Sequence, residues 1–195
     1  MSSILFGTNN PDKLREIRAI VGPPLQVMSL REAGIDLDVE ETEDTLVGNA
    51  LLKARTYHQA SGLPCFADDT GLEVDALGGA PGVYSARYAG PDCSYQDNVA
   101  KMLREMAGKA VRTARFRTAI AFVDSEAEYT FEGVVEGTIT EEVRGEGGFG
   151  YDPLFLPEGQ HQTFAEMAPA DKHAISHRGK AVRKLADFLQ TYRPA

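Results

Sequence analysis

Short apolar runs alternate with helix-like patterns along the first part of the chain. Residues 3–8 form an apolar run that predicts a buried strand. The segment Asn10-Pro11-Asp12 supplies an N-cap, a first-position proline and a first-turn acid for a helix that Gly22-Pro23-Pro24 ends. Residues 25–28 form a second apolar run. This order of strand, helix and strand predicts an α/β fold.

The later patterns predict further helices and a β-hairpin. The helices are expected at about Thr45–Ser61 with Gly62 as the C-cap, at Ser94–Met106 with Ser94 as the N-cap, and at Ser176–Tyr192. The hairpin is expected over residues 112–124 and 128–136, with residues 138–144 as a candidate extension and residues 145–151 as a glycine-rich loop.

Two adjacent acids, Asp68 and Asp69, follow the apolar run 63–67. We interpret this run as a buried strand whose end opens onto a cleft, followed by a separate half-buried strand over residues 71–77. Adjacent buried carboxylates repel each other, so they need a cation to neutralise them or a proton to transfer. A solvated β-turn is the alternative, because Asp-Asp-Thr-Gly also suits a turn.

The composition limits the class of protein. The 195 residues, 43% of them hydrophobic, fit one globular domain or two lobes that share a cleft. A net charge of −9 argues against binding to a nucleic acid polymer. No run approaches 18 apolar residues and the N-terminus lacks a signal pattern, so we expect no membrane span. Cys65 and Cys93 form no disulfide or zinc framework, which favours a reducing compartment.

The turn Thr8-Asn9-Asn10-Pro11-Asp12-Lys13 is a candidate phosphate site. Free N–H groups at a helix start attract phosphate, and Lys13 adds a full charge. The alternative is an ordinary capped helix, because this turn lacks the glycines of the known phosphate-binding loops.

A candidate metal site is formed by Glu40 and Glu41 together with Asp68 and Asp69. Oxygen ligands without His or Cys suit Mg²⁺ or Mn²⁺. Lys53 lies on the inner face of its predicted helix, where it can reach these acids and hold them ionised. The alternatives are a solvated acidic loop and a lysine whose ammonium group reaches water.

Two further segments offer ligand contacts. In the loop 147–153, Phe149 and Tyr151 can stack on a planar ring and Asp152 offers acceptors, unless the aromatics simply pack in the core. Lys172 and the turn Ser176-His177-Arg178 gather donors at a helix start, unless that turn is a solvent-facing cap.

Over its full length the chain resembles the inosine triphosphate pyrophosphatase family. The resemblance rests on the following segments, in this order: Thr8-x-Asn10-x-x-Lys13, Glu41 with Asn49-Ala50 and Lys53-Ala54, Ala67-Asp68-Asp69-Thr70-Gly71-Leu72, Leu77-Gly78-Gly79-Ala80-Pro81-Gly82, Ser85-Ala86-Arg87-Tyr88, Gly148-Phe149-Gly150-Tyr151-Asp152-Pro153 and Ile175-Ser176-His177-Arg178.

The resemblance implies an α/β fold with two lobes around a long central mixed β-sheet with flanking helices, and an active site in the cleft between the lobes. It implies one domain over residues 1–195, a cytoplasmic homodimer and a requirement for Mg²⁺, with Mn²⁺ as a possible substitute. The expected reaction is hydrolysis of ITP, dITP and XTP to the monophosphate and pyrophosphate, which cleanses the nucleotide pool.

The resemblance also assigns roles to residues. Glu41 and Asp69 would bind the metal, and Asp69 would be the base on water, supported by Asp68 and Lys53. The triphosphate and the rest of the substrate would be held by Thr8, Asn9, Asn10, Pro11, Asp12, Lys13, Thr70, Phe149, Gly150, Tyr151, Asp152, Lys172, His177 and Arg178. Donors from Arg178, His177 or loop N–H groups would pair with the 6-carbonyl of hypoxanthine and leave the amino group of adenine unpaired.

Two positions depart from the commonest family pattern. Asn9 stands where glycine is frequent, and Gly48 stands where glutamate is common, which leaves the choice between Glu40 and Glu41 open. A pyrophosphatase of other base preference, such as a Maf-like enzyme acting on dTTP or UTP, and a non-catalytic nucleotide-binding module are the alternative functions. The preferred substrate, the number of metal ions, the dimer interface and the rejection of GTP do not follow from the sequence.

Overall fold

The fold is α/β, as the sequence predicts, and contains a mixed six-stranded sheet. We describe a computed structural model in which residues 3–21, 23 and 25–192 are placed; Gly22 and Pro24, assigned above to a helix end, lie outside these residues. The sheet order is β2-β1-β3-β4-β5-β6, with β1 parallel to β2 and β3, and β6 antiparallel to β5. The strands are β1 Ser3–Phe6, β2 Gln26–Ser29, β3 Cys65–Val74, β4 Thr113–Val123, β5 Glu128–Ile139 and β6 Phe155–Pro157.

The helices begin and end largely where the capping residues predict. They are α1 Pro11–Val21, α2 Leu46–Ser61, α3 Tyr95–Met106, α4 Pro169–Ile175 and α5 His177–Thr191, with 3₁₀ turns η1 Asp75–Leu77, η2 Gly82–Arg87 and η3 Asp152–Leu154. Thr45 caps α2, Gly62 ends it in the left-handed conformation, and Ser94 forms a capping box on α3. The predictions for these two helices are confirmed, whereas α4, β6 and the 3₁₀ turns were not predicted.

The chain divides into two compact units. Unit 1 comprises residues 1–69, 118–133 and 178–195, and unit 2 comprises residues 70–117 and 134–177. The strands β3, β4 and β5 therefore contribute residues to both units.

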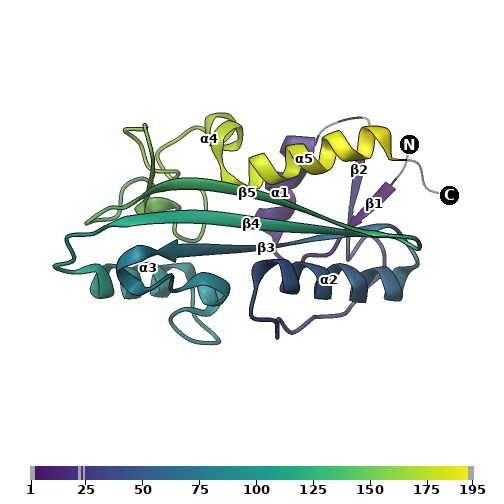
Figure 1. Cartoon of the computed structure of the whole chain (residues 1–195), viewed down its shortest axis with the longest axis horizontal. Helices are drawn as coiled ribbons and strands as arrows, with labels where there is room; N and C mark the ends of the chain where they lie inside the picture. Colours follow the sequence, from purple (N-terminus) through teal and green to yellow (C-terminus); the bar gives the residue numbers. More distant parts are fainter. Residues whose placement is uncertain (1–2, 22, 24, 193–195) are drawn as a thin grey trace. The chain divides into compact units, whose positions relative to one another are not determined.

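In unit 1 the strands are covered on both faces. Figure 1 shows α1 and α5 on one side of these strands and α2 on the other. Phe6 and Phe66 stack with their ring centroids 4.6 Å apart on the α1/α5 side, in a cluster with Ile17 of α1 and Leu185 of α5. On the other face, Leu5, Leu30 and Cys65 pack with Tyr57 of α2. Neighbouring strand residues thus point to opposite faces, as the pleat requires.

Unit 2 has its own core. Leu72 and Val74 of β3 pack with Met102 and Met106 of α3, and the ring of Phe116 lies 4.7 Å from that of Phe155. Phe164 packs in the same cluster. Among the described residues, no helix combines the length and the apolar character needed to cross a bilayer.

The structure corrects the prediction for the acidic pair. β3 runs without a break through Asp68 and Asp69 to Val74, so the acids lie within a strand and not at its end, and residues 71–77 are not a separate strand. A solvated turn is also wrong, because Asp68 and Asp69 are only 1% and 5% exposed. In a solvated turn, water would surround the two carboxylates. In this structure cationic side chains contact them on each face of the strand instead.

The candidate extension after the hairpin is only partly a strand. β5 ends at Ile139, and Thr140 donates its backbone N–H to the carbonyl of Leu154 at 2.8 Å instead of continuing the β4–β5 hairpin. The short β6 follows this contact.

Candidate active site

Asp68 and Asp69 belong to different side-chain clusters of unit 1. Asp68 shares the face of Phe66 and contacts residues of α1 and α5, while Asp69 shares the face of Cys65 and contacts residues of α2. The twofold repeat of the strand makes this division, because adjacent side chains leave a strand on opposite faces.

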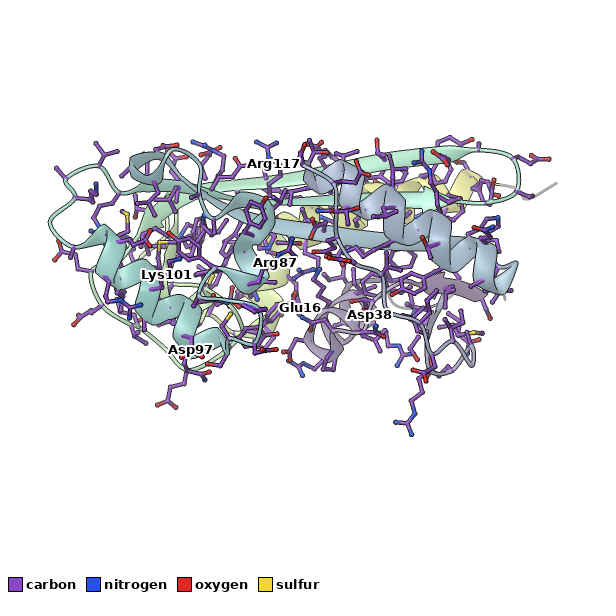
Figure 2. The ribbon with its side chains drawn as sticks, turned by 90° about the horizontal axis from the view of Figure 1, so that it is seen from below. Glu16, Asp38, Arg87, Asp97, Lys101 and Arg117 are labelled. Atoms are coloured by element: carbon purple, nitrogen blue, oxygen red, sulfur yellow. The ribbon has the colours of Figure 1, made fainter. Side chains whose placement is uncertain are left out.

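The Asp68 cluster contains two acids and two cations. Lys13 Nζ lies 3.1 Å from Asp68 Oδ1, and Arg178 Nε lies 3.4 Å from Oδ2. Arg178 Nη1 also contacts the carboxylate of Glu16, and Glu16, Asp68 and Arg178 are all buried. Figure 2 labels Glu16 on α1. Paired charges of this kind satisfy the requirement that a buried charge has a partner.

The pKa values in this cluster follow from burial and from the partners. Burial alone would raise the pKa of Asp68, but Lys13 and Arg178 hold that pKa well below its ordinary value. Burial lowers the pKa of Lys13, and Asp68 offsets part of this effect. Asp68 is therefore an ionised counter-charge that helps to keep Lys13 protonated.

In the Asp69 cluster, burial and charged neighbours shift the pKa of the acid in the other direction. Lys53 Nζ contacts Glu41 and lies 3.9 Å from Asp69 Oδ1, while Asn49 donates to Asp69 Oδ2 at 3.2 Å. Burial and the nearby charge of Glu41 raise the pKa of Asp69 to about 6, although Lys53 opposes them. The pKa of Lys53 is raised because Asp69 and Glu41 outweigh its burial. Lys53 thus reaches the acids, and the alternative of an ammonium group in water is wrong.

Glu41 and Asp69 suit a hard divalent cation. Among the described residues, no group of three or more His, Cys, Asp or Glu side chains is arranged to hold a metal ion. Mg²⁺, however, typically takes one or two protein carboxylates and completes its shell with water and substrate phosphates. The repulsion between Glu41 and Asp69 is the kind of strain that a cation relieves. Glu41 turns towards Lys53, whereas the neighbouring Glu40 is exposed.

The turn 8–13 has the geometry of a capped helix. Asn10 Oδ1 accepts hydrogen bonds from the N–H groups of Asp12 at 2.9 Å and Lys13 at 3.2 Å. Asn10 N–H donates to Thr8 Oγ1 at 3.2 Å, and Asn9 Nδ2 donates to Asp38 at 3.1 Å. Two of the helix-start N–H groups are therefore engaged by the cap, and the ammonium group of Lys13 is the main positive charge of this turn.

A second candidate cluster lies in unit 2. Lys172 Nζ pairs with Asp152 Oδ2 at 2.6 Å, and the same oxygen accepts from Phe149 N–H at 2.8 Å. Lys172 Nζ also lies 5.2 Å from the centroid of the Phe149 ring. Tyr151 is buried and donates its hydroxyl to the Ser85 carbonyl at 2.7 Å, which matches the core-packing alternative, while Phe149 is only partly buried.

Lys172 of α4 and the donors His177 and Arg178 at the start of α5 contact different groups. Lys172 pairs with Asp152, the ring of His177 stacks on Phe116 at 4.5 Å, and Arg178 pairs with Asp68. All three side chains are buried, so the alternative of a solvent-facing turn is wrong. Thr70 follows Asp69 on β3 and is partly buried.

Three buried polar residues of these clusters were given no role in the sequence analysis. Glu16 lies three positions after Lys13 on α1, and Asn49 lies four positions before Lys53 on α2, so each shares a helix face with a lysine that was singled out. This spacing could have indicated both. Ser85 accepts from Leu72 N–H at 2.9 Å, and no spacing in the sequence indicates that contact.

Known proteins resemble the chain over nearly its whole length. It is 54% identical over 190 residues to a dITP/XTP pyrophosphatase of Porphyromonas gingivalis, covering 97% of this chain and 98% of that one. It is 45% identical over 194 residues to a dITP/XTP pyrophosphatase of Bacillus subtilis, covering 97% and 98%.

Solved structures of similar proteins share the fold. The Staphylococcus aureus Ham1 protein has a TM-score of 0.88 at 38% identity, covering 97% of this chain and 98% of that chain. A HAM1 protein from Coxiella burnetii has a TM-score of 0.89 at 38% identity, covering 98% and 100%. The model of the Ham1 family matches residues 4–188. The chain therefore belongs to the Ham1 family.

Proposed function

We propose that the chain is a nucleoside triphosphate pyrophosphatase that hydrolyses dITP, XTP and ITP to the monophosphate and pyrophosphate. The names of its relatives support the first two substrates. The observation that carries the proposal is the environment of Asp69, a buried carboxylate whose pKa is raised to about 6 between Glu41, Lys53 and Asn49.

Asp69 is the proposed general base. A carboxylate with a pKa near the working pH is ionised often enough to act and basic enough to accept a proton. Asn49 donates to Asp69 Oδ2 and fixes the carboxylate, which would orient a water or take its proton. Lys53 pairs with both Glu41 and Asp69 and so holds the two carboxylates next to each other.

Lys13 is the proposed phosphate ligand. Phosphoanhydride hydrolysis depends mainly on positioning and on stabilising the charge that develops on phosphate oxygens. Asp68 offsets the effect of burial on Lys13 and fixes its ammonium group, so that Lys13 remains a cation. Arg178 holds the other oxygen of Asp68.

We propose Mg²⁺ as the cofactor, with Mn²⁺ as a substitute and with Glu41 and Asp69 as its protein ligands. When bound, the ion would neutralise charge on the phosphate oxygens. The assignment of Phe149, Gly150, Tyr151, Asp152, Lys172, His177 and Arg178 to the base and sugar stays a prediction, as do the roles of the turn 8–13 and of Thr70. A homodimer, a single domain and a cytoplasmic location also stay predictions.

A panel of nucleoside triphosphates tests the proposal. The panel contains dITP, XTP, ITP, dATP, GTP, dTTP and UTP, each with Mg²⁺, and scores pyrophosphate and orthophosphate separately. We expect pyrophosphate from dITP, XTP and ITP. Preference for dTTP or UTP would favour the Maf-like alternative, orthophosphate as the first product would indicate attack at the γ-phosphate, and binding without turnover would favour a nucleotide-binding module.

A further inference from the structure

The segment that carries Glu41 has no regular secondary structure. Residues 36–43 belong to no helix or strand, so the position of Glu41 depends on contacts made by the side chains and backbone of this segment. Lys53 holds Glu41 itself, Tyr57 donates to the Leu37 carbonyl at 3.3 Å, and Glu43 N–H donates to Asn49 at 3.0 Å. These three contacts all come from α2.

One further contact to this segment comes from the turn before α1 and not from α2. Asn9, in the turn before α1, donates from Nδ2 to Asp38 Oδ1 at 3.1 Å. A carboxylate only accepts hydrogen bonds, so the amide nitrogen of Asn9 must face Asp38. Figure 2 labels Asp38 in the segment that precedes α2. Within unit 1, this hydrogen bond joins the turn of Lys13 to the segment of Glu41.

We propose that the Asn9–Asp38 hydrogen bond is a latch that positions Glu41 for metal binding and ties the metal-binding segment to the phosphate-binding turn. This inference rests on the proposed function for the identity of the metal site. Glu41 lies three residues after Asp38 in the irregular segment, so a shift at Asp38 is transmitted along a short piece of chain. Because the contact is exposed, the effect of losing it is that of about one hydrogen bond, or roughly a two- to tenfold change in affinity.

The side chain of Asn9 can be truncated without disturbing the backbone of the turn. The backbone of Asn9 does not have a positive φ, so alanine is tolerated there without strain. Asn9→Ala therefore removes the bond alone.

Exchanging the residues at positions 9 and 38 distinguishes the effect of the hydrogen bond from the effect of added negative charge. Asn9→Asp places two carboxylates opposite each other and adds one negative charge, which by itself would tighten the binding of a cation. If the latch matters, the same variant instead weakens that binding. Asn9→Asp combined with Asp38→Asn has the net charge of the native protein and restores the bond with donor and acceptor exchanged.

The experiment measures the Kd of Mn²⁺ alone, by electron paramagnetic resonance, on the full chain without nucleotide. We expect Asn9→Ala and Asn9→Asp to raise the Kd about two- to tenfold, and the double variant to return it to within about twofold of the native value. Asp36→Asn is the matched control, because Asp36 is exposed on the same segment and its side chain makes no hydrogen bond or ion pair with the residues that the structure describes. Thermal melts confirm that each variant is folded.

The outcomes are distinct. Unchanged or tighter Mn²⁺ binding in both single variants overturns the latch, and so does a double variant that stays as weak as Asn9→Asp. A rise in the Kd for Asp36→Asn as large as that for Asn9→Ala would show that Mn²⁺ binding responds to any change in this segment, and would also overturn the latch. A failure of the proposed function would be seen separately, as absence of pyrophosphate from the native chain in the nucleotide panel.

Discussion

Asp68 and Asp69 are neighbours in sequence, yet Asp68 pairs with Lys13 and Asp69 with Lys53 and Asn49, on opposite faces of β3. The pKa of Asp68 is lowered and that of Asp69 is raised to about 6. A strand that passes between two covered faces thus gives two identical side chains different environments. The two acids therefore have different proposed roles, and their amide variants should differ accordingly.

Asp69→Asn removes the proposed base. We expect kcat to fall by about 10²–10⁴-fold, the usual contribution of a positioned base. The raised pKa of Asp69 means that folding disfavours its ionised form, so the variant should be as stable as the native protein at pH 7, or more stable. Steady-state kinetics and urea unfolding check both points, and near-normal turnover would contradict the role of Asp69.

Asp68→Asn should have the opposite effect on stability from Asp69→Asn. It leaves Lys13 and Arg178 without their shared acid, and breaking a buried ion pair costs about 3–5 kcal/mol. We expect a large loss in the free energy of unfolding at pH 7, measured by urea unfolding. If Asp68→Asn and Asp69→Asn were equally stable, the division of the two acids between faces would be of no energetic consequence.

The stabilisation from Asp68 should depend on pH. Because the pKa of Asp68 is lower in the folded protein, its contribution is present above the ordinary pKa of about 4 and is lost as the pH falls below it. The stability difference between the native protein and Asp68→Asn should therefore shrink on acidification. Urea unfolding at pH 7, 5 and 3 measures this, provided that the native state persists; a difference that grows with acid would be the wrong sign.

Gly148→Ala tests the second cluster. A Cβ at Gly148 would overlap the carboxylate of Asp152, which is engaged by Lys172 and Phe149 N–H. Gly150 is the matched control, because it also has a positive φ but its Cβ would meet nothing within 4 Å. We expect Gly148→Ala to lower the melting temperature clearly more than Gly150→Ala, and equal melting temperatures would show that Asp152 moves freely.

Cys65 should be inert in the folded protein. It is fully buried, and burial raises the pKa of its thiol to about 12, so almost no thiolate is present at pH 8. In a Cys93→Ser background we expect no thiol to react with Ellman's reagent in buffer and one to react in guanidinium chloride. Rapid labelling of the folded variant would place Cys65 in a more open environment than the structure does.

The elements with strong local signals could be predicted from the sequence. Thr45, Gly62 and Ser94 mark helix ends through their own backbone contacts, so α2 and α3 were predicted closely. Lys53 was singled out because a charged residue on an apolar helix face needs a partner, and it contacts Glu41 and Asp69.

The path of β3 could not be predicted in the same way. Whether Asp68-Asp69-Thr70-Gly71 forms a turn or a strand depends on Lys13 and Arg178, which are distant in sequence. The pairing of Arg178 with Glu16 spans 162 residues, and no local pattern encodes it. The local sequence was therefore enough to single out the two acids. Their strand conformation and their separate partners depend on tertiary contacts.

The position of the attacked phosphorus decides whether the chain is the proposed pyrophosphatase. The native protein hydrolyses dITP with Mg²⁺ in water enriched in ¹⁸O, and mass spectrometry measures the ¹⁸O content of each product. Attack of water on the α-phosphorus predicts one ¹⁸O atom in the nucleoside monophosphate and none in pyrophosphate. Label in pyrophosphate or release of labelled orthophosphate would contradict it.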